Sequence, residues 1–272
     1  MQPKQKVILI LSDGLRYDTA VEHMGFLGHL VEARRASLYK LTGELPSMSR
    51  PMYETLHTGL MSSEHGIVSN SMARCSSRPN VFDLASRAGL VTAAAAYFWF
   101  SELYNRAPYH RTDHREVDDA TLAIQHGRFY TEDDTPDLEV FAAAGTLVRR
   151  HKPHYLLVHP MGMDYTGEAF GSDSREYRNH AIRQDAWLTP FLVEWLEMGY
   201  EILFTSDHGM SPDASHGGTA PGVREVPLYW IQPKVQGLGD TGQTVSQLRI
   251  APTLCQLLGL PIPATMKHPP IA

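Results

Sequence analysis

The chain has 272 residues, 43% hydrophobic and 20% charged, which is enough apolar material for one large α/β domain or two small ones, and we favour one domain with a buried core. Its formal net charge of -6 at pH 7 excludes the strongly basic surface of proteins that use nucleic acid as a scaffold, although a nucleotide remains acceptable as a small substrate. The two cysteines, Cys75 and Cys255, fit no zinc or redox spacing. The first apolar run is too short to span a membrane or to export the chain. We therefore expect a cytoplasmic enzyme without membrane insertion.

The first predicted element is a buried parallel strand over residues 7–11, where an unbroken apolar run precedes Asp13. Asp13 would then follow the carboxyl end of a strand, which is where open α/β sheets bind their ligands. The alternative is that Asp13 caps the next helix, which we expect over about 17–35. Another strand is predicted over 37–41.

A serine between two prolines follows that strand. Pro46 and Pro51 favour an extended approach to a helix that begins after Pro51 and ends at Gly59. Ser49 would lie beside the amino terminus of this helix, where exposed backbone N–H groups favour an anion. A hydroxyl that touches a metal has a lowered pKa, which can make Ser49 a nucleophile. The alternative is a helix-capping serine.

The rest of the chain is predicted to alternate helices and strands. Helices are expected over about 80–88, 136–150 and 249–258, and strands over 90–96, 154–159 and 226–231. The aromatic residues 97–100 favour packing on the sheet over a role as a pocket wall. The polar stretch 104–136 is interpreted as an insertion or lid. A long helix over 175–198 is interpreted as packing, with His180 and Asp185 on its surface.

Asp207 and His208 follow a predicted buried strand over 200–205, so they also lie at a carboxyl end. A carboxylate and an imidazole on adjacent residues of a tight loop can bind one small divalent cation. Because Asp13 occupies the equivalent place on another strand, the two strand ends together indicate a metal site.

The motifs that carry a family resemblance are Asp13, the segment 46–51, His65-Gly66-Ile67, Asn70 and the segment 206–210. Together they resemble the alkaline phosphatase superfamily, and within it the type I phosphodiesterase/nucleotide pyrophosphatase branch. That branch carries Pro-Thr-x-Thr-x-Pro, whose second threonine is the nucleophile, and Ser49 stands at the matching position. Asn70 falls where the branch has an asparagine that holds a phosphoryl oxygen. The resemblance implies one α/β domain over 1–272 with a three-layer, doubly wound core, in which helices cover both faces of a mostly parallel central sheet.

The resemblance also implies two divalent metal ions, zinc or manganese with magnesium as a third candidate. The residues that match the family's ligands are Asp13, Ser49, Asp207 and His208 for one ion, and Asp164, Glu168 and His216 for the other. Glu168 departs from the family, which has a histidine at this position. A glutamate can still coordinate and would favour harder ions than zinc, or it can fail to reach the ion. Arg50, beside Ser49, is a candidate for substrate binding or for an outward-facing helix residue.

The expected reaction is hydrolysis of a phosphate ester, most of all a phosphodiester or a nucleotide pyrophosphate bond, through a phosphorylated Ser49. The alternatives within the superfamily are a phosphomonoesterase, a phosphonate hydrolase and a phosphotransferase. Phosphoethanolamine transferases resemble residues 206–218 closely, but they act at membranes. Tyr53 stands where sulfatases have an arginine, which argues against a sulfatase. A further alternative is a non-catalytic protein that binds a phosphorylated ligand or partner through a metal. The oligomeric state and the natural substrate stay open.

Overall fold

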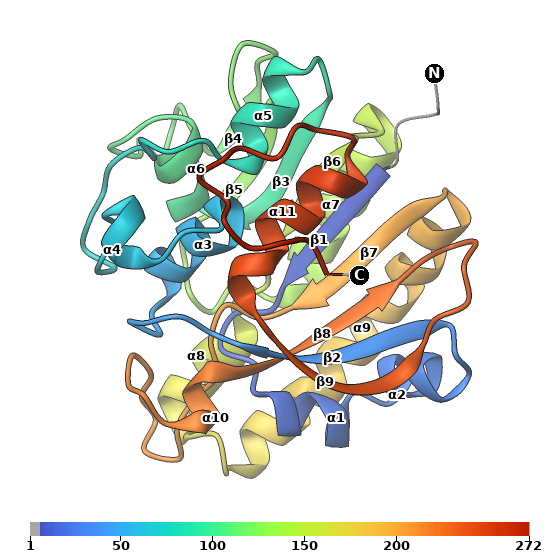
Figure 1. Cartoon of the computed structure of the whole chain (residues 1–272). Helices are drawn as coiled ribbons and strands as arrows, with labels where there is room; N and C mark the ends of the chain where they lie inside the picture. The colour runs from blue at the N-terminus through green and yellow to red at the C-terminus, as the bar shows by residue number, and fades with distance from the viewer. Residues whose placement is uncertain (1–5, 272) are drawn as a thin grey trace.

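The computed structural model describes residues 6–271, and within them nine strands form one sheet (Figure 1). The strands are β1 (Lys6–Leu11), β2 (Ala36–Thr42), β3 (Thr92–Tyr97), β4 (Glu116–Asp118), β5 (His126–Tyr130), β6 (Tyr155–Val158), β7 (Tyr200–Thr205), β8 (Glu225–Ile231) and β9 (Gly239–Ser246). Their order across the sheet is β4-β5-β3-β6-β1-β7-β8-β2-β9, so the first strand of the chain is the central one.

The sheet is mostly parallel. β1 pairs in parallel with β6 and β7, β3 pairs in parallel with β5 and β6, and β2 pairs in parallel with β9. β8 runs antiparallel to both β7 and β2, and β4 runs antiparallel to β5. The carboxyl ends of β1, β6 and β7 therefore meet at the same end of the sheet, and the predicted fold class is confirmed.

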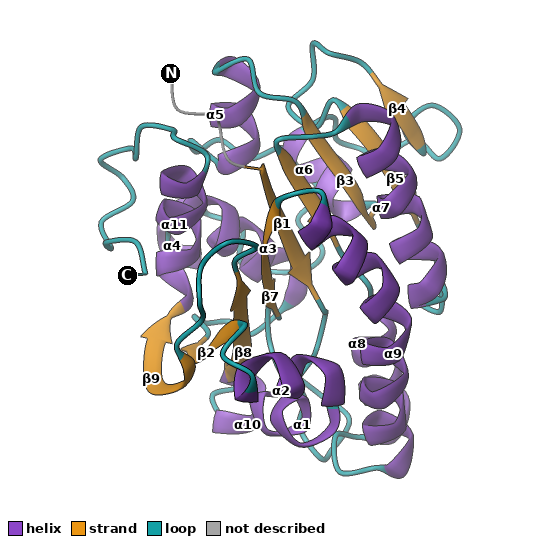
Figure 2. Cartoon of the chain, turned by 90° about the vertical axis from the view of Figure 1, so that its right-hand side faces the viewer, coloured by secondary structure: helices purple, strands orange, loops and turns teal. Residues whose placement is uncertain are grey.

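Helices cover both faces of the sheet, which is seen edge-on between them in Figure 2. One layer contains α1 (Tyr17–His23), α2 (Gly25–Glu32), α7 (Asp137–His151), α8 (Gly162–Phe170) and α9 (Arg175–Glu197). The other contains α3 (Ser49–Thr58), α4 (Ser62–His65), α5 (Val81–Arg87), α6 (Trp99–Tyr104) and α11 (Ile250–Leu257). Two short helical turns precede other elements: α10 (Pro221–Arg224) leads into β8, and η1 (Gln247–Arg249) leads into α11.

The side chains of β1 explain why this strand is apolar at every position. Val7, Leu9 and Leu11 belong to the core beneath α3, α5 and α11, whereas Ile8 and Ile10 belong to the core beneath α7 and α9. All five are completely buried, because both faces of a central parallel strand are covered. Burial of each such side chain contributes about 1.5–3 kcal/mol.

One predicted helix is in fact two, and Asp185 explains the break. The helix expected over 17–35 ends at His23, and α2 begins at Gly25. The Asp185 carboxylate of α9 accepts hydrogen bonds from the backbone N–H groups of Phe26 (2.7 Å) and Leu27 (3.2 Å). These are among the first N–H groups of α2, which have no partner within the helix. The prediction that Asp185 is a surface residue is therefore wrong, because it is buried as a cap for another helix.

His180 was also predicted to lie on the surface, and this is wrong in part. Its Nε2 lies 2.8 Å from Asp137 Oδ2, and Asp137 Oδ1 accepts a hydrogen bond from the N–H of Gly162 at 3.0 Å. Asp137 is buried at the start of α7, so this contact ties together the amino ends of α7 and α8 beside α9. A helical periodicity cannot reveal such a contact between three helices.

The segment 104–136, predicted as an insertion or lid, contributes β4 and β5 to the edge of the sheet. Only alternate residues of β5 are fully buried, which is why the segment looks polar in the sequence. Its role as a lid stays a prediction. β9, at the other edge, was not predicted, because six of its eight residues, the run Gly239–Thr244, are Gly, Asp, Thr or Gln. Among residues 6–271 no helix is both long enough and apolar enough to cross a membrane.

Candidate active site

Three strand ends bring polar side chains to one place. Asp13 lies just beyond β1, His159 just beyond β6, and Asp207 just beyond β7. The parallel registers of these strands put the three side chains side by side. All three are completely buried, as is His208. Such burial is unusual for carboxylates, which normally need a cation or several hydrogen-bond donors in that environment.

Within the described residues, only one of the two oxygens of the Asp13 carboxylate accepts hydrogen bonds. Its Oδ2 accepts hydrogen bonds from the hydroxyl of Tyr53 and from His159 Nε2, the latter at 3.0 Å. Its Oδ1 is buried but makes no hydrogen bond with any described residue. Burial, together with the neighbouring Asp207 carboxylate, raises the pKa of Asp13 well above its usual range. The free oxygen therefore needs a proton or a cation.

Asp207 repeats this arrangement. Its Oδ1 accepts hydrogen bonds from the N–H of Gly14 (3.2 Å) and the hydroxyl of Ser206 (3.3 Å). Its Oδ2 is buried and, among residues 6–271, has no hydrogen-bond partner. Burial raises the pKa of Asp207 as well. Two carboxylates thus each direct one unpartnered oxygen into the same space.

An imidazole completes this first group. His208 Nδ1 lies 2.8 Å from the carbonyl of Gly209, which assigns the ring proton to Nδ1 and leaves the lone pair on Nε2. That Nε2 lies 3.3 Å from the free oxygen of Asp13 and 3.3 Å from the free oxygen of Asp207. These three ligand atoms lie close enough together to hold one metal ion.

Ser49 lies against this group. It is the first residue of α3 and is almost completely buried, and its Oγ is 3.1 Å from His208 Nε2. Asn70 lies beside it, because the Asn70 Oδ1 accepts a hydrogen bond from the N–H of Arg50 at 3.0 Å. The structure therefore brings together the predicted nucleophile, the predicted phosphoryl-binding asparagine and the amino end of a helix.

A second group lies next to the first. His216 Nε2 is 3.8 Å from Asp164 Oδ1 and 3.3 Å from Glu168 Oε1, and the His208 and His216 rings stack with centroids 4.1 Å apart. Asp164 and Glu168 lie one turn apart on α8, so they share a face. Asp164, His208 and His216 can hold a metal ion, whereas Glu168 contacts His216 from a more exposed position.

Electrostatics favour a cation in this second group too. Burial and the nearby Asp13 raise the pKa of Asp164, whose Oδ1 has no hydrogen-bond partner in the described part of the chain. Burial lowers the pKa of His208, and His216 lowers it further. Although burial opposes it, the hydrogen bond of His216 with Glu168 and the charges of Asp164 and Asp13 raise the pKa of His216 to about 9. Free carboxylate oxygens and imidazole nitrogens are the donors that zinc and manganese prefer, so the residues fit a pair of divalent cations.

Arg50 has a buried partner of its own. Its guanidinium lies 2.8 Å from Glu102 Oε2 and 4.5 Å from the ring centroid of Trp99. Both charged side chains are almost completely buried. The aromatic stretch 97–100 thus packs around α3, as expected, since Phe100 also stacks on Tyr53. Contact between Arg50 and a substrate stays a prediction.

Sequence reasoning assigned no site role to Tyr53 or His159. Tyr53 lies four residues after Ser49, so one turn of α3 places both on the side that faces Asp13. His159 directly follows β6, a strand that neighbours β1, so it lies at a carboxyl end of the sheet as Asp13 does. The helical spacing and the strand-end position are signals that could have identified both residues.

Solved structures share this fold. A structure of murine ectonucleotide pyrophosphatase/phosphodiesterase 5, an inactive variant in complex with AMP, superimposes with a TM-score of 0.72 over 96% of each chain at 16% identity. A phosphonate monoester hydrolase from Silicibacter pomeroyi superimposes with a TM-score of 0.66 over 98% of this chain and 76% of that chain, at 13% identity. At these identities the likeness concerns the fold alone.

Curated relatives include GPI ethanolamine phosphate transferase 2 of Aspergillus oryzae, 25% identical over 95% of this chain and 32% of that protein. The catalytic subunit of the human GPI ethanolamine phosphate transferase 2 is also 25% identical, over 95% of this chain and 27% of that protein. An uncharacterized pyrophosphatase/phosphodiesterase of Schizosaccharomyces pombe is 27% identical over 77% of this chain and 46% of that protein. The chain thus spans less than half the length of each.

A family model described as type I phosphodiesterase/nucleotide pyrophosphatase matches residues 7–218. The match includes every residue of the two groups described above, from Asp13 to His216. It covers well over half of the chain. The chain therefore belongs to the type I phosphodiesterase/nucleotide pyrophosphatase family, as the sequence motifs predicted.

Proposed function

We propose that the chain is a metal-dependent phosphodiesterase that uses Ser49 as its nucleophile. The observation that carries the proposal is the set of unpartnered carboxylate oxygens beside the Ser49 hydroxyl. Asp13 Oδ1, Asp164 Oδ1 and Asp207 Oδ2 are all buried and make no hydrogen bond within residues 6–271. The Asp13 and Asp207 oxygens each lie 3.3 Å from His208 Nε2, which is 3.1 Å from Ser49 Oγ. Buried anionic oxygens are costly unless cations neutralise them, and membership of the family supports the same chemistry.

The donor set divides between two cations. Asp13, Asp207, His208 and Ser49 would hold one, and Asp164 and His216 would hold the other. Glu168 is a further candidate ligand because it already contacts His216. When bound, two divalent cations lower the pKa of a coordinated hydroxyl and neutralise the charge that develops on a phosphoryl group.

The first step is the attack of Ser49 Oγ on the phosphorus atom. The Oγ–P bond forms and the ester P–O bond to the leaving alcohol breaks. Ser49 loses its hydroxyl proton in this step, and the departing alkoxide takes up one proton to become the alcohol. Because Asn70 Oδ1 is held by the N–H of Arg50, its Nδ2 is left to donate to a phosphoryl oxygen, and the amino end of α3 favours the same negative charge.

The second step regenerates the serine. A water oxygen forms a bond to phosphorus, the Oγ–P bond breaks, and Ser49 regains a proton. An alcohol in place of water would turn the same sequence into a transfer reaction. Transfer is the second candidate function, and the relatives named GPI ethanolamine phosphate transferases favour it. Hydrolysis and transfer use the same site residues and differ only in the acceptor.

The test is turnover of bis-p-nitrophenyl phosphate beside p-nitrophenyl phosphate, after chelation and readdition of zinc, manganese or magnesium. We expect the diester to be preferred and activity to return with zinc or manganese. Preference for the monoester would instead support a phosphomonoesterase. No turnover of either ester with any of the metals would contradict the proposal and favour a metal-dependent binding protein.

The acceptor is tested in the same assay by adding a simple alcohol such as glycerol. A hydrolase gives mono-p-nitrophenyl phosphate in equal amount to p-nitrophenol. A transferase gives the glycerol ester of mono-p-nitrophenyl phosphate as its main product, although water is in large excess. Product analysis by phosphorus NMR distinguishes the two, because the diester and monoester phosphorus nuclei resonate at different positions.

A further inference from the structure

A second histidine and carboxylate cluster lies at the opposite end of the sheet. It consists of Asp118 on β4, His126 at the start of β5 and His151 at the end of α7. β5 runs parallel to the strands that lead into the active site, so its first residue lies at the amino end of the sheet. Figure 2 shows β4 and β5 at the edge of the sheet, beside α7. We refer to these three residues as the edge cluster.

Both imidazoles of the edge cluster direct a nitrogen at the same oxygen. His126 Nδ1 lies 2.8 Å and His151 Nε2 3.5 Å from Asp118 Oδ1. The two rings stack with centroids 3.6 Å apart and planes 18° apart. The two ring nitrogens and the carboxylate oxygen thus lie close together, as the ligands of one metal ion do.

The other oxygen of Asp118 is already occupied. Arg128 donates a hydrogen bond to Asp118 Oδ2 at 2.9 Å, which fixes the carboxylate and leaves Oδ1 toward the rings. The side chain of Asp118 is 49% exposed, and those of His126 and His151 are 19% and 23% exposed. The cluster is thus open to solvent on one side. A water molecule can take a fourth ligand position there.

The spacing suits a tetrahedral ion. Zinc lies about 2.0–2.2 Å from imidazole nitrogens and carboxylate oxygens, so its tetrahedral ligands are separated by roughly 3.4 Å. The separation of His151 Nε2 from Asp118 Oδ1 already has this value to within about 0.1 Å. His126 Nδ1 would have to move away from Asp118 Oδ1 by about 0.6 Å. The ligand atoms of all three residues lie within 4.8 Å of one another.

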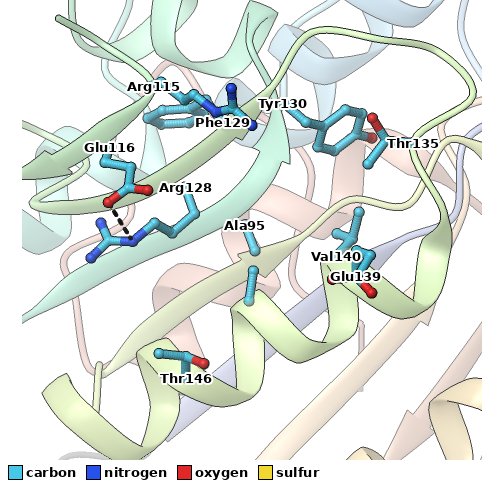
Figure 3. Close-up of a pocket in the computed structure, with 11 residues that line it drawn as sticks. Ala95, Arg115, Glu116, Arg128, Phe129, Tyr130, Thr135, Glu139, Val140 and Thr146 are labelled. Atoms are coloured by element: carbon cyan, nitrogen blue, oxygen red, sulfur yellow. Dashed lines mark ion pairs between the residues drawn. The ribbon is translucent and has the colours of Figure 1, made fainter. Parts of the chain in front are cut away.

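We propose that Asp118, His126 and His151 bind a divalent cation of the zinc class, with water as the fourth ligand. The ion would fasten the β4–β5 edge to the last turn of α7. These elements form the two walls of a cavity of about 400 Å³ (Figure 3), with Arg128 and Phe129 on the β5 side and Glu139 and Val140 on the α7 side. The site therefore sets how far apart these walls lie. It is separate from the active site and does not depend on the proposed function.

The test is the number of zinc ions bound per chain, measured by mass spectrometry after chelation and dialysis against zinc at a fixed free concentration. His151→Gln removes one ligand, whereas His23→Gln removes a surface histidine whose nearest carboxylate, Glu22, lies 3.8 Å away. We expect His151→Gln to bind about one zinc fewer than the wild type and His23→Gln to bind as much as the wild type. Equal zinc in His151→Gln and the wild type would overturn the proposal.

Two further variants keep the test decisive. Asp118→Asn preserves shape and should cause the same loss if His151→Gln does not fold. Asp207→Asn weakens the first group of the active site. In that background His151→Gln should still remove about one zinc ion per chain, because the active site and the edge cluster lie at opposite ends of the sheet. Loss of zinc only when the active site is intact would mean that the edge cluster binds none.

Discussion

The active-site group, by which we mean the first and second groups together, and the edge cluster contain similar residues in different surroundings. Each has a carboxylate with one oxygen already engaged, and each has two stacked imidazoles. In the active-site group, however, Asp13 and Asp207 are completely buried, whereas Asp118 is 49% exposed and paired with Arg128. The buried carboxylates depend on a cation for their charge to be tolerated. The exposed one does not, so occupancy of the edge cluster can vary without cost to the fold.

Glu54 is a buried carboxylate that belongs to no candidate metal group among the described residues. It lies on α3 next to Tyr53, is completely buried, and accepts a hydrogen bond from the hydroxyl of Ser76. Burial raises the pKa of Glu54 to about 7. At Glu54 a proton thus supplies the neutralisation that we propose metal ions supply near Ser49, at the start of the same helix.

The largest effect is expected from the nucleophile. Ser49→Ala should lower turnover of the diester by at least about a thousandfold, because no other hydroxyl occupies that place. Bound zinc and the melting temperature should change little, since Asp13, Asp207 and His208 remain. The matched control is Ser62→Ala, which removes another buried serine hydroxyl that has no hydrogen-bond partner among residues 6–271. Activity retained in Ser49→Ala would show that the nucleophile is assigned wrongly.

The next effect tests the proton at Glu54. Its pKa is about 7 in the folded chain and 4.5 in the absence of burial, so between these values the folded state binds more protons than the unfolded state. The free energy of unfolding should therefore fall by roughly 3 kcal/mol as the pH rises from 4.5 to 7. Glu54→Gln should lose this part of the pH dependence and be more stable than the wild type above pH 7, while the buried aspartates Asp13, Asp164 and Asp207 keep their own contributions. Denaturant unfolding from pH 5 to 8 measures it.

The exposed residue Glu176 provides the control for that experiment. Glu176→Gln should leave the slope of stability against pH as it is in the wild type. If Glu54→Gln keeps the wild-type slope, the buried carboxylate is not the group that titrates, and the contrast between proton and metal neutralisation fails.

A smaller effect is expected from the loss of the Tyr53 hydroxyl, which donates a hydrogen bond to Asp13. Tyr53→Phe removes the hydroxyl that holds Asp13 Oδ2, and loss of such a supporting hydrogen bond costs about 10- to 100-fold in metal affinity or activity. Excess zinc should restore part of the activity. Tyr155→Phe is the matched control, because its buried hydroxyl contacts His57 at 2.9 Å instead of a carboxylate of the site. Equal zinc affinity in Tyr53→Phe and the wild type would contradict a positioning role.

The smallest effect concerns Glu168. Its hydrogen bond with His216 lowers the pKa of Glu168, so the carboxylate is charged at neutral pH beside the second group. If it coordinates, Glu168→His should shift the metal preference toward zinc over manganese by roughly tenfold, as imidazole replaces an oxygen donor. Glu168→Gln keeps the size and removes the charge, and should weaken both metals. Competition titrations with both metals measure the ratio, and an unchanged ratio in Glu168→His would place this residue outside the metal site.

Local patterns in the sequence were sufficient for much of the fold and for the main site residues. The apolar runs at residues 7–11 and 200–205 predicted central strands, because a strand buried on both faces is apolar throughout. Asp13 and Asp207 could then be placed together, since parallel strands end at the same side of the sheet. The prolines around Ser49 placed it beside the amino end of a helix, whereas its role as the nucleophile was implied by the family resemblance.

The sequence alone determined the helices, strands and residue positions that depend on residues nearby in the chain. The tertiary structure decided which distant side chains meet: Tyr53 and His159 on Asp13, Asp185 on the amino end of α2, and the three residues of the edge cluster. The physical reason is that these contacts depend on strand order and on how α3, α7 and α9 pack against the sheet. A polar residue carries the same local pattern whether packing leaves it in solvent or buries it against a partner far along the chain.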